Sequence, residues 1–199
     1  SDSQAMGRVG ETSTRCWQTA HKNKEQFGKL PEDAKENDNF RVLRYLAKLT
    51  INPAITNGVA DYLGSLEPGK MADIVLWDPK FFGAKPKMIF KGGFIAWAMM
   101  GDPNASIPTP EPYYWRPMFG GFGLAQSRIS AIFTSKIAIE KGIKEKYGLQ
   151  RQVLPVCKTR DLGKQHMVRN NRTGTITIDP ETHKVTLDGK EITSQPAKT

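Results

Sequence analysis

One carboxylate near the amino end of the chain is the side chain whose neighbours best suit it to chemistry. Asp2 lies in the segment SDSQAMGRVGE, among small residues and ahead of a stretch that is compatible with a helix. Such a carboxylate can bind a divalent cation or accept a proton, and the small Ala5 and Gly7 leave room for a ligand to approach the backbone. Aspartate is also common in turns, so residue types alone favour a structural turn at Asp2.

The histidines and cysteines form no recognisable metal or catalytic motif. None of His21, His166 and His183 lies at HxH, HxxxH or HxxE spacing, and Cys16 and Cys157 are far apart in the sequence. A complete metal site needs several donors that converge. GxSxG, P-loop and GxGxxG motifs are also missing. We therefore expect exposed histidines and no self-sufficient active site within this chain.

The net charge of +9 comes mostly from one segment. Residues 136–172 hold ten basic residues against three acidic ones. Such a surface can bind nucleic acid or an anionic membrane, or it can be solvated or contact an acidic neighbouring chain. Aromatic residues are not interleaved with these charges as a base-stacking platform requires, and no apolar run of 18 residues is present. We therefore predict no nucleic-acid partner and no membrane partner.

Capping and turn residues predict helices first and strands afterwards. A helix is expected over 15–27, a second beginning near Asp38, and a third from Asn52 to Gly64. On the second helix, an apolar stripe is predicted from Phe40, Leu43, Leu46 and Ala47.

Strands are predicted over 73–77, 87–90, 94–97, 129–134, 175–178, 185–187 and 190–192, and a further helix over 135–147. The pairs Gly92-Gly93 and Asp188-Gly189 are typical of tight hairpin turns. This order indicates an α+β fold, or the end of an α/β barrel followed by a β module.

Several strings, taken together, resemble the catalytic alpha subunits of the urease family, which belongs to the amidohydrolase superfamily. The match begins with SDSQAMGRVGE and covers nearly the whole chain. The other matching strings are WQTA at 17–20, DNFR at 38–41, TINPA at 50–54, GKMAD at 69–73, FFG at 81–83, KGG at 91–93, GDPNASIPTP at 101–110, RQV at 151–153 and DPET at 179–182.

The resemblance implies an α/β fold class. Residues 1–63 would form the C-terminal end of a TIM-like (β/α)8 amidohydrolase barrel. Residues 64–110 would supply strands that return to a β-sandwich-like composite domain, and residues 111–199 a C-terminal α+β extension. Active sites of such barrels lie at the C-terminal ends of the strands, which is where the resemblance places the first residues of this chain.

The resemblance also implies roles for three residues of the first segment. Asp2 aligns with a carboxylate ligand of one of two nickel ions. The backbone carbonyl of Ala5 aligns with an acceptor for a urea amide hydrogen, and Met6 lines the same cavity. The remaining metal ligands, including a carbamylated lysine that bridges the nickel ions, would lie upstream of this chain.

The implied activity is hydrolysis of urea to ammonia and carbamate by attack of a metal-bound hydroxide. Implied partners are the remainder of the alpha subunit, smaller beta and gamma subunits or their fused equivalent, and accessory proteins that load nickel. The assembly would be a cytoplasmic homo-oligomer of heteromers. The alternative is a non-catalytic assembly module, inactive on its own, that makes subunit contacts.

Overall fold

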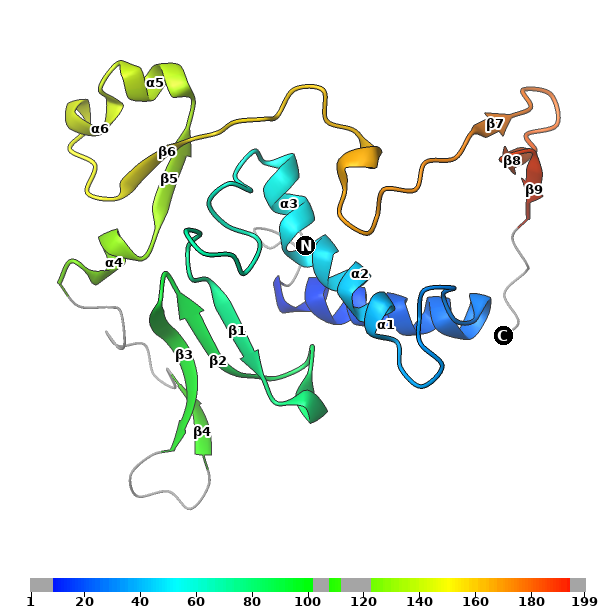
Figure 1. Ribbon diagram of the computed structural model, residues 1–199, viewed down its shortest axis with the longest axis horizontal. Coiled ribbons are helices and arrows are strands. Elements are labelled where there is room, and N and C mark those ends of the chain that lie inside the picture. Colours follow the sequence, from blue (N-terminus) through cyan, green and yellow to red (C-terminus); the bar gives the residue numbers. More distant parts are fainter. Residues whose placement is uncertain (1–8, 102–107, 112–122, 194–199) are drawn as a thin grey trace.

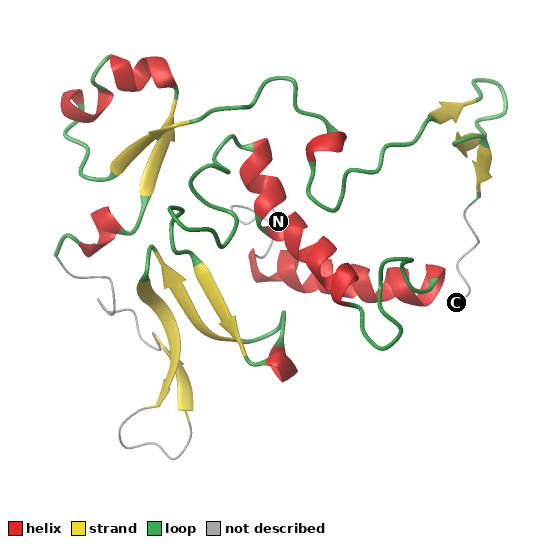
Figure 2. Ribbon diagram, in the orientation of Figure 1, coloured by secondary structure: helices red, strands yellow, loops and turns green. Residues whose placement is uncertain are grey.

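Helices gather in the amino-terminal part of the chain and strands follow them. The computed structural model describes residues 9–101, 108–111 and 123–193 (Figure 1). The first helices are α1 (Val9–Phe27), α2 (Asn39–Leu49) and α3 (Ile51–Thr56). Figure 2 shows these helices beside a sheet, with two smaller sheets further along the chain. The described chain is therefore a mixed α/β structure, as the sequence predicts.

The largest sheet is an antiparallel meander in the order β1-β2-β3-β4. Its strands are β1 (Ile74–Trp77), β2 (Pro86–Lys91), β3 (Phe94–Gly101) and β4 (Pro108–Glu111), and the 3-10 helix η1 (Pro79–Phe81) follows β1. The predicted hairpin between β2 and β3 is confirmed, because Lys91 pairs with Phe94 across the turn. Gly92 and Gly93 both have positive φ, of 57° and 86°.

The second sheet is a parallel pair that a helical connection joins. Strand β5 (Ala131–Thr134) pairs with β6 (Gln152–Pro155), after a short helix α4 (Ala125–Arg128). The connection contains α5 (Lys136–Glu140) and α6 (Ile143–Lys146). The prediction of one helix over 135–147 is wrong, because Gly142 adopts a left-handed conformation with φ of 69° and interrupts it.

The third sheet lies near the end of the described chain. After the 3-10 helix η3 (Lys164–His166), strands β7 (Ile176–Ile178), β8 (Val185–Leu187) and β9 (Lys190–Ile192) form a second antiparallel meander. The Asp188-Gly189 turn has positive φ at both residues, 51° and 79°. This geometry is that of the predicted tight hairpin.

Two helix boundaries differ from the predictions. Helix α1 begins at Val9 rather than Arg15, with Glu11 in its first turn where a carboxylate complements the helix dipole. Helix α3 begins at Ile51 but ends at Thr56 rather than at Gly64. At Gly58 the positive φ of 68° turns the chain away from the helix axis. Only glycine fits there, because a Cβ atom would lie 2.5 Å from the carbonyl oxygen of Cys157.

The buried side chains are few, and most of them are small. On α2 the buried residues are Arg41, Tyr45 and Ala47, whereas Leu43 of the predicted apolar stripe is exposed. The chain exposes 15,388 Å², whereas a compact monomer of this mass exposes about 9,400 Å². Much of its surface is thus available for contacts outside the chain.

The described helices and sheets do not by themselves form a complete barrel or β sandwich. The predicted barrel, the predicted β sandwich and the domain boundaries therefore stay predictions. Among the described residues, no helix combines the length and the apolar character needed to cross a membrane.

Candidate functional site

The residues predicted to form the site, Asp2, Ala5 and Met6, lie outside the described residues. The description starts at Val9, which is the first residue of helix α1. The structure therefore shows how the helix that directly follows the predicted site segment is held in place.

An aromatic cluster holds the first half of α1 against the turn after β1. The Trp17 ring lies edge-on to the Phe82 ring, with centroids 5.1 Å apart, and Trp77 of β1 packs on the same ring at 5.7 Å. Gly83 completes the contact, since a Cβ atom there would lie 2.7 Å from Nε1 of Trp17. Only glycine allows the indole to approach the backbone so closely.

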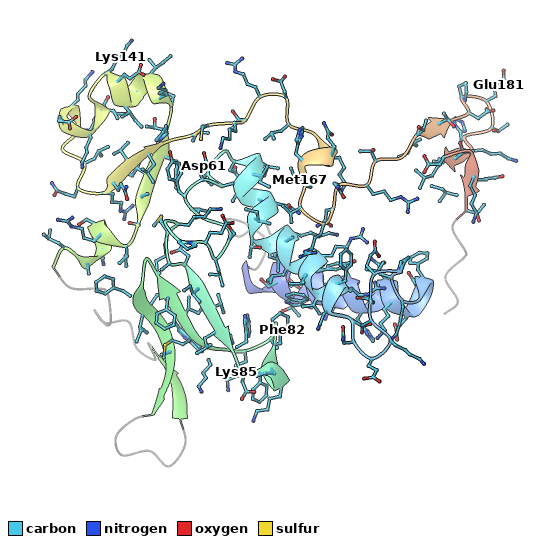
Figure 3. All side chains as sticks on the ribbon, viewed as in Figure 1. Asp61, Phe82, Lys85, Lys141, Met167 and Glu181 are labelled. Atoms are coloured by element: carbon cyan, nitrogen blue, oxygen red, sulfur yellow. The ribbon has the colours of Figure 1, made fainter. Side chains whose placement is uncertain are left out.

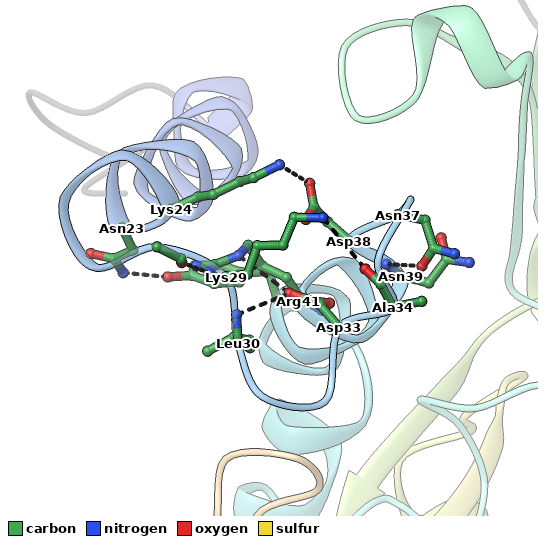
Figure 4. Close-up of polar contacts among 12 residues, drawn as sticks. Asn23, Lys24, Lys29, Leu30, Asp33, Ala34, Asn37, Asp38, Asn39 and Arg41 are labelled. Atoms are coloured by element: carbon green, nitrogen blue, oxygen red, sulfur yellow. Dashed lines mark hydrogen bonds and ion pairs between the residues drawn. The ribbon is translucent and has the colours of Figure 1, made fainter.

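Hydrogen bonds attach α1 to α2. The Asn23 side chain donates to the hydroxyl of Tyr45 at 2.6 Å, and the Cys16 thiol lies 3.9 Å from the carbonyl oxygen of Tyr45. The Lys24 ammonium donates to Asp38, just before α2 (Figure 4). This hydrogen bond holds the pKa of the Asp38 carboxyl below its usual value.

A buried ion pair fixes the connector between the two helices (Figure 4). The carboxylate of Asp33 accepts a hydrogen bond from the backbone N–H of Arg41 at 3.0 Å, and its other oxygen lies 3.9 Å from Nε of Arg41. The guanidinium also donates to the carbonyl oxygen of Gly28 at 2.7 Å. The Asp33 side chain is 0% exposed and that of Arg41 is 7% exposed, so each charge depends on the other.

A second set of contacts joins α3 to the later part of the chain. The amide of Asn52 donates to the carbonyl oxygen of Val168 at 3.1 Å and accepts from its N–H at 2.8 Å. Asn170 is buried and donates to the carbonyl oxygen of Arg44 at 3.0 Å. The loop after η3 is thereby fixed on the helices.

A charged contact reinforces this junction near Gly58. The Lys158 ammonium donates to both carboxylate oxygens of Asp61 at 2.7 and 2.8 Å. The hydrogen bonds lower the pKa of Asp61 and raise that of Lys158. Burial, and then the hydrogen bond to Asp61, raise the pKa of the Cys157 thiol, so this cysteine is a poor nucleophile.

The three histidines are exposed, as predicted, and lie in different parts of the structure. His21 faces Glu25 on α1 at 3.4 Å, Nδ1 of His166 accepts from the N–H of Gly163, and His183 sits in a turn with φ of 56°. Over the part of the chain that the structure describes, no three His, Cys, Asp or Glu side chains are grouped to hold a metal ion. The described residues therefore do not make a metal site by themselves.

Sequence reasoning missed the Asp33–Arg41 pair and the two asparagines. Asp33 lies in an acidic connector in which Glu32 and Glu36 are exposed, and no local pattern separates it from these neighbours. The TINPA string included Asn52, but its contact with Val168 is 116 residues away in sequence. Only the tertiary structure could identify these groups.

Comparison with known proteins agrees with the predicted resemblance. A family model described as "Amidohydrolase family" matches residues 1–142. The chain is 58% identical over 196 residues to urease subunit alpha 2 of Brucella suis biovar 1 (strain 1330) and to that of Brucella melitensis biotype 1. Each alignment covers 98% of this chain and 34% of the relative.

A relative from another genus gives the same result. Urease subunit alpha of Yersinia enterocolitica is 58% identical over 199 residues, which is 100% of this chain and 35% of that protein. The chain thus spans about a third of the length of the curated relatives it matches.

Proposed function

The chain belongs to the amidohydrolase family, and from this premise we propose that it is the C-terminal part of a urease catalytic subunit that hydrolyses urea to ammonia and carbamate. The observation that carries the proposal is the 58% identity to urease alpha subunits over 98% to 100% of this chain.

The chemistry assigned to this chain lies in its first residues. Asp2 is proposed as a carboxylate ligand of one of two nickel ions, which when bound polarise the urea carbonyl. The backbone carbonyl of Ala5 accepts a hydrogen bond from a urea amide, and Met6 lines the same cavity. The described residues contain no metal cluster of their own. The resemblance to urease alpha subunits implies that the other ligands lie upstream of Asp2.

The anchoring of α1 supports this assignment. Trp17 fixes the helix to the turn after β1, and Asn23 and Lys24 fix it to α2 and its connector. A ligand that must hold a metal within a few tenths of an ångström needs such a rigid support. Helix α1 is therefore suited to carry the segment that holds Asp2.

The same family membership extends to the fold. We propose that residues 1–63 complete a (β/α)8 barrel, that residues 64–110 join a composite β domain, and that residues 111–199 form a C-terminal extension. The exposed area of 15,388 Å² supports this arrangement, because faces that are open in this chain would pack against the remainder of the subunit.

A second role, in assembly, is favoured by the same surface. Large apolar side chains are exposed on several elements, including Phe27, Leu66, Phe94 and Ile137. We propose that some of these faces contact the smaller beta and gamma subunits or a further alpha subunit in a cytoplasmic complex, and that accessory proteins load its nickel. This role accompanies catalysis and does not replace it.

Replacement of Asp2 by alanine in the full-length subunit tests the catalytic assignment. We expect the nickel content to fall at one of the two positions, because a hard oxygen ligand is lost, and ureolysis to fall by more than about 100-fold. Metal analysis and ammonia release measure the two effects. Normal nickel content with normal turnover would refute the role of Asp2.

Asp61→Ala provides a matched control. It also removes an aspartate, but one whose carboxylate is bound to Lys158 far along the sequence. We expect this variant to retain nickel and ureolysis. A loss of nickel equal to that of Asp2→Ala would mean that the metal depends on the fold in general and not on a ligand at position 2.

A further inference from the structure

The parallel pair β5–β6 and its helices carry an excess of basic side chains. Helices α5 and α6 lie at one end of the two strands and α4 near the other (Figure 1), and Lys141 lies at the outer end of this unit (Figure 3). Residues 123–155 contain six basic side chains, Arg128, Lys136, Lys141, Lys144, Lys146 and Arg151, and two acidic ones, Glu140 and Glu145. The excess of positive charge favours anionic ligands.

A cavity of about 470 Å³ opens between the elements of this unit. It is lined by Leu124, Ser127, Arg128, Lys144, Gln150 and Gln152. Its size lies within the range of small-molecule sites. Five of the six lining side chains carry hydrogen-bonding or charged groups, so its chemistry is polar.

Three different elements position the polar groups of the cavity. Arg128 ends α4, where its backbone N–H is bonded to the carbonyl oxygen of Leu124 at 3.2 Å. The carbonyl oxygen of Lys144, in α6, accepts from the N–H of Leu149 at 2.9 Å. Gln152 begins β6 and pairs with Ala131 of β5. The cavity is therefore built on backbone that secondary structure holds.

The position of α4 is fixed from outside the unit as well. Ile129, the residue after Arg128, packs directly on the β2–β3 hairpin, where a Cβ atom on Gly92 would lie 2.7 Å from the Cα atom of Ile129. This contact leaves no room for another side chain. It holds the end of α4, and with it the start of the Arg128 side chain.

The two cations that line the cavity have no ion-pair partner among the described residues. Among the described residues, no carboxylate forms an ion pair with Arg128 or Lys144, although Lys136 in the same unit faces Glu140 at 3.9 Å. A guanidinium and an ammonium among the lining side chains provide a planar fork and a point charge for oxygen atoms. The amides of Gln150 and Gln152 supply further donors.

We propose that this cavity binds a small oxyanion with two negative charges, of the phosphate or dicarboxylate class. Two cations match two negative charges, and the amide donors match the remaining oxygen lone pairs. The site goes beyond the proposed ureolysis, since it uses none of the residues assigned to metal or urea.

Chemical labelling of lysines in the full-length subunit tests the proposal at residue resolution. The protein is acetylated briefly in phosphate, in succinate or in chloride at equal ionic strength, and the modified lysines are quantified by mass spectrometry. We expect phosphate or succinate to slow the labelling of Lys144 at least about threefold relative to chloride. Lys141, in the same unit but outside the cavity wall, serves as the internal control and should be labelled at the same rate in every salt.

The Arg128→Gln variant separates a built site from diffuse attraction. It removes one charge of the proposed pair and should abolish the protection of Lys144, while Arg128→Lys should retain part of it because the charge remains. An unchanged circular dichroism spectrum shows that the variants keep the fold. Equal protection of both lysines, no protection of Lys144 in either anion, or full protection in Arg128→Gln would each overturn the proposal.

Discussion

The helical region around α1 and α2 and the sheet β7–β9 contain similar ion pairs and apolar side chains, but the first region buries them and the second exposes them. In the helical region, Asp33 and Arg41 form an ion pair with side chains that are 0% and 7% exposed. In the sheet, Lys184 and Glu191 form a pair at 3.8 Å, with side chains 61% and 48% exposed. Figure 1 shows the sheet lying apart from the other sheets.

The apolar side chains show the same contrast. Tyr45 of α2 is only 4% exposed. Ile176 and Ile178 of β7 share one face of their sheet, as alternate residues of a strand do, and each is more than 60% exposed. The comparison shows that alternating residues and a suitable turn are enough to form a hairpin. The contribution of each side chain to stability depends instead on how far other residues bury it.

The Asp33→Ala variant should show the largest effect, because it leaves the buried guanidinium of Arg41 without its counter-charge. We expect the free energy of opening of α2 to fall by about 3–5 kcal/mol. Hydrogen exchange of the α2 amides in the full-length subunit measures it. The matched variant Glu191→Ala removes a carboxylate from an exposed pair, and exchange in β8 and β9 should change by less than about 0.5 kcal/mol. Equal effects of the two variants would show that the buried ion pair contributes no more to stability than the exposed one.

Asn52→Ala should have the next largest effect. It removes two hydrogen bonds to the backbone of Val168. The N–H of Val168 then loses its partner, whereas the carbonyl oxygen still accepts a hydrogen bond from Asn170 at 3.0 Å. We expect a loss of about 2–3 kcal/mol in the stability of the junction between α3 and the loop after η3.

Asn57→Ala provides the control for this variant. Asn57 lies at the end of the same helix, but its side chain is exposed and donates only to the carbonyl oxygen of Pro53. Exchange of the Val168 amide should therefore increase strongly in Asn52→Ala and little in Asn57→Ala. Equal exchange in both variants would show that the loop is held by other contacts.

Acidification should weaken the contact between Asp61 and Lys158. The folded-state pKa of Asp61 lies below its usual value, so the stabilisation is present above the usual aspartate pKa of about 3.9 and is lost as the pH falls through the lowered one. Exchange of the Cys157 amide, which donates to the carbonyl oxygen of Gly58 at 3.0 Å, should rise in that acidic range after correction for intrinsic rates. In Asp61→Asn this pH dependence should disappear; its persistence would assign it to another group.

The smallest expected effect concerns the thiols. Burial raises the pKa of both Cys16 and Cys157, so alkylation at pH 8 should be slower than that of a free cysteine peptide. Asp61→Asn should speed the alkylation of Cys157 by about threefold and leave that of Cys16 unchanged, as peptide mass spectrometry would show. An equal change at both cysteines would indicate a general loosening of the fold.

The sequence predicts the parts of the fold that depend on local chemistry. The Gly92-Gly93 and Asp188-Gly189 turns form where glycine and aspartate allow positive φ. Helix α2 begins directly after Asp38 as predicted, but the Asp38 side chain makes no capping hydrogen bond and binds Lys24 instead. The pairing of β5 with β6 is different, because it is parallel and its two strands are separated by a helical connection. No local turn signal in the sequence predicts such a pair.

The candidate site divides in the same way. The resemblance assigns Asp2, Ala5 and Met6, and their roles stay predictions because these residues lie outside the described ranges. The supports of α1 could not be read from the sequence, since Trp17, Asn23 and Lys24 act through partners that lie on other elements. The exposure of Leu43 could not be predicted either, because its place on the apolar stripe of α2 indicates burial but the structure leaves it exposed.

The bonds between Asn52 and Val168 also set an order of events during translation. Hairpins such as β2–β3 can close soon after their residues leave the ribosome, because their partners are adjacent in the chain. Asn52 can bond to Val168 only after the ribosome has added that residue, 116 positions later. Contacts of such long range also form slowly. Until then the end of α3 lacks these contacts and is accessible to chaperones and proteases.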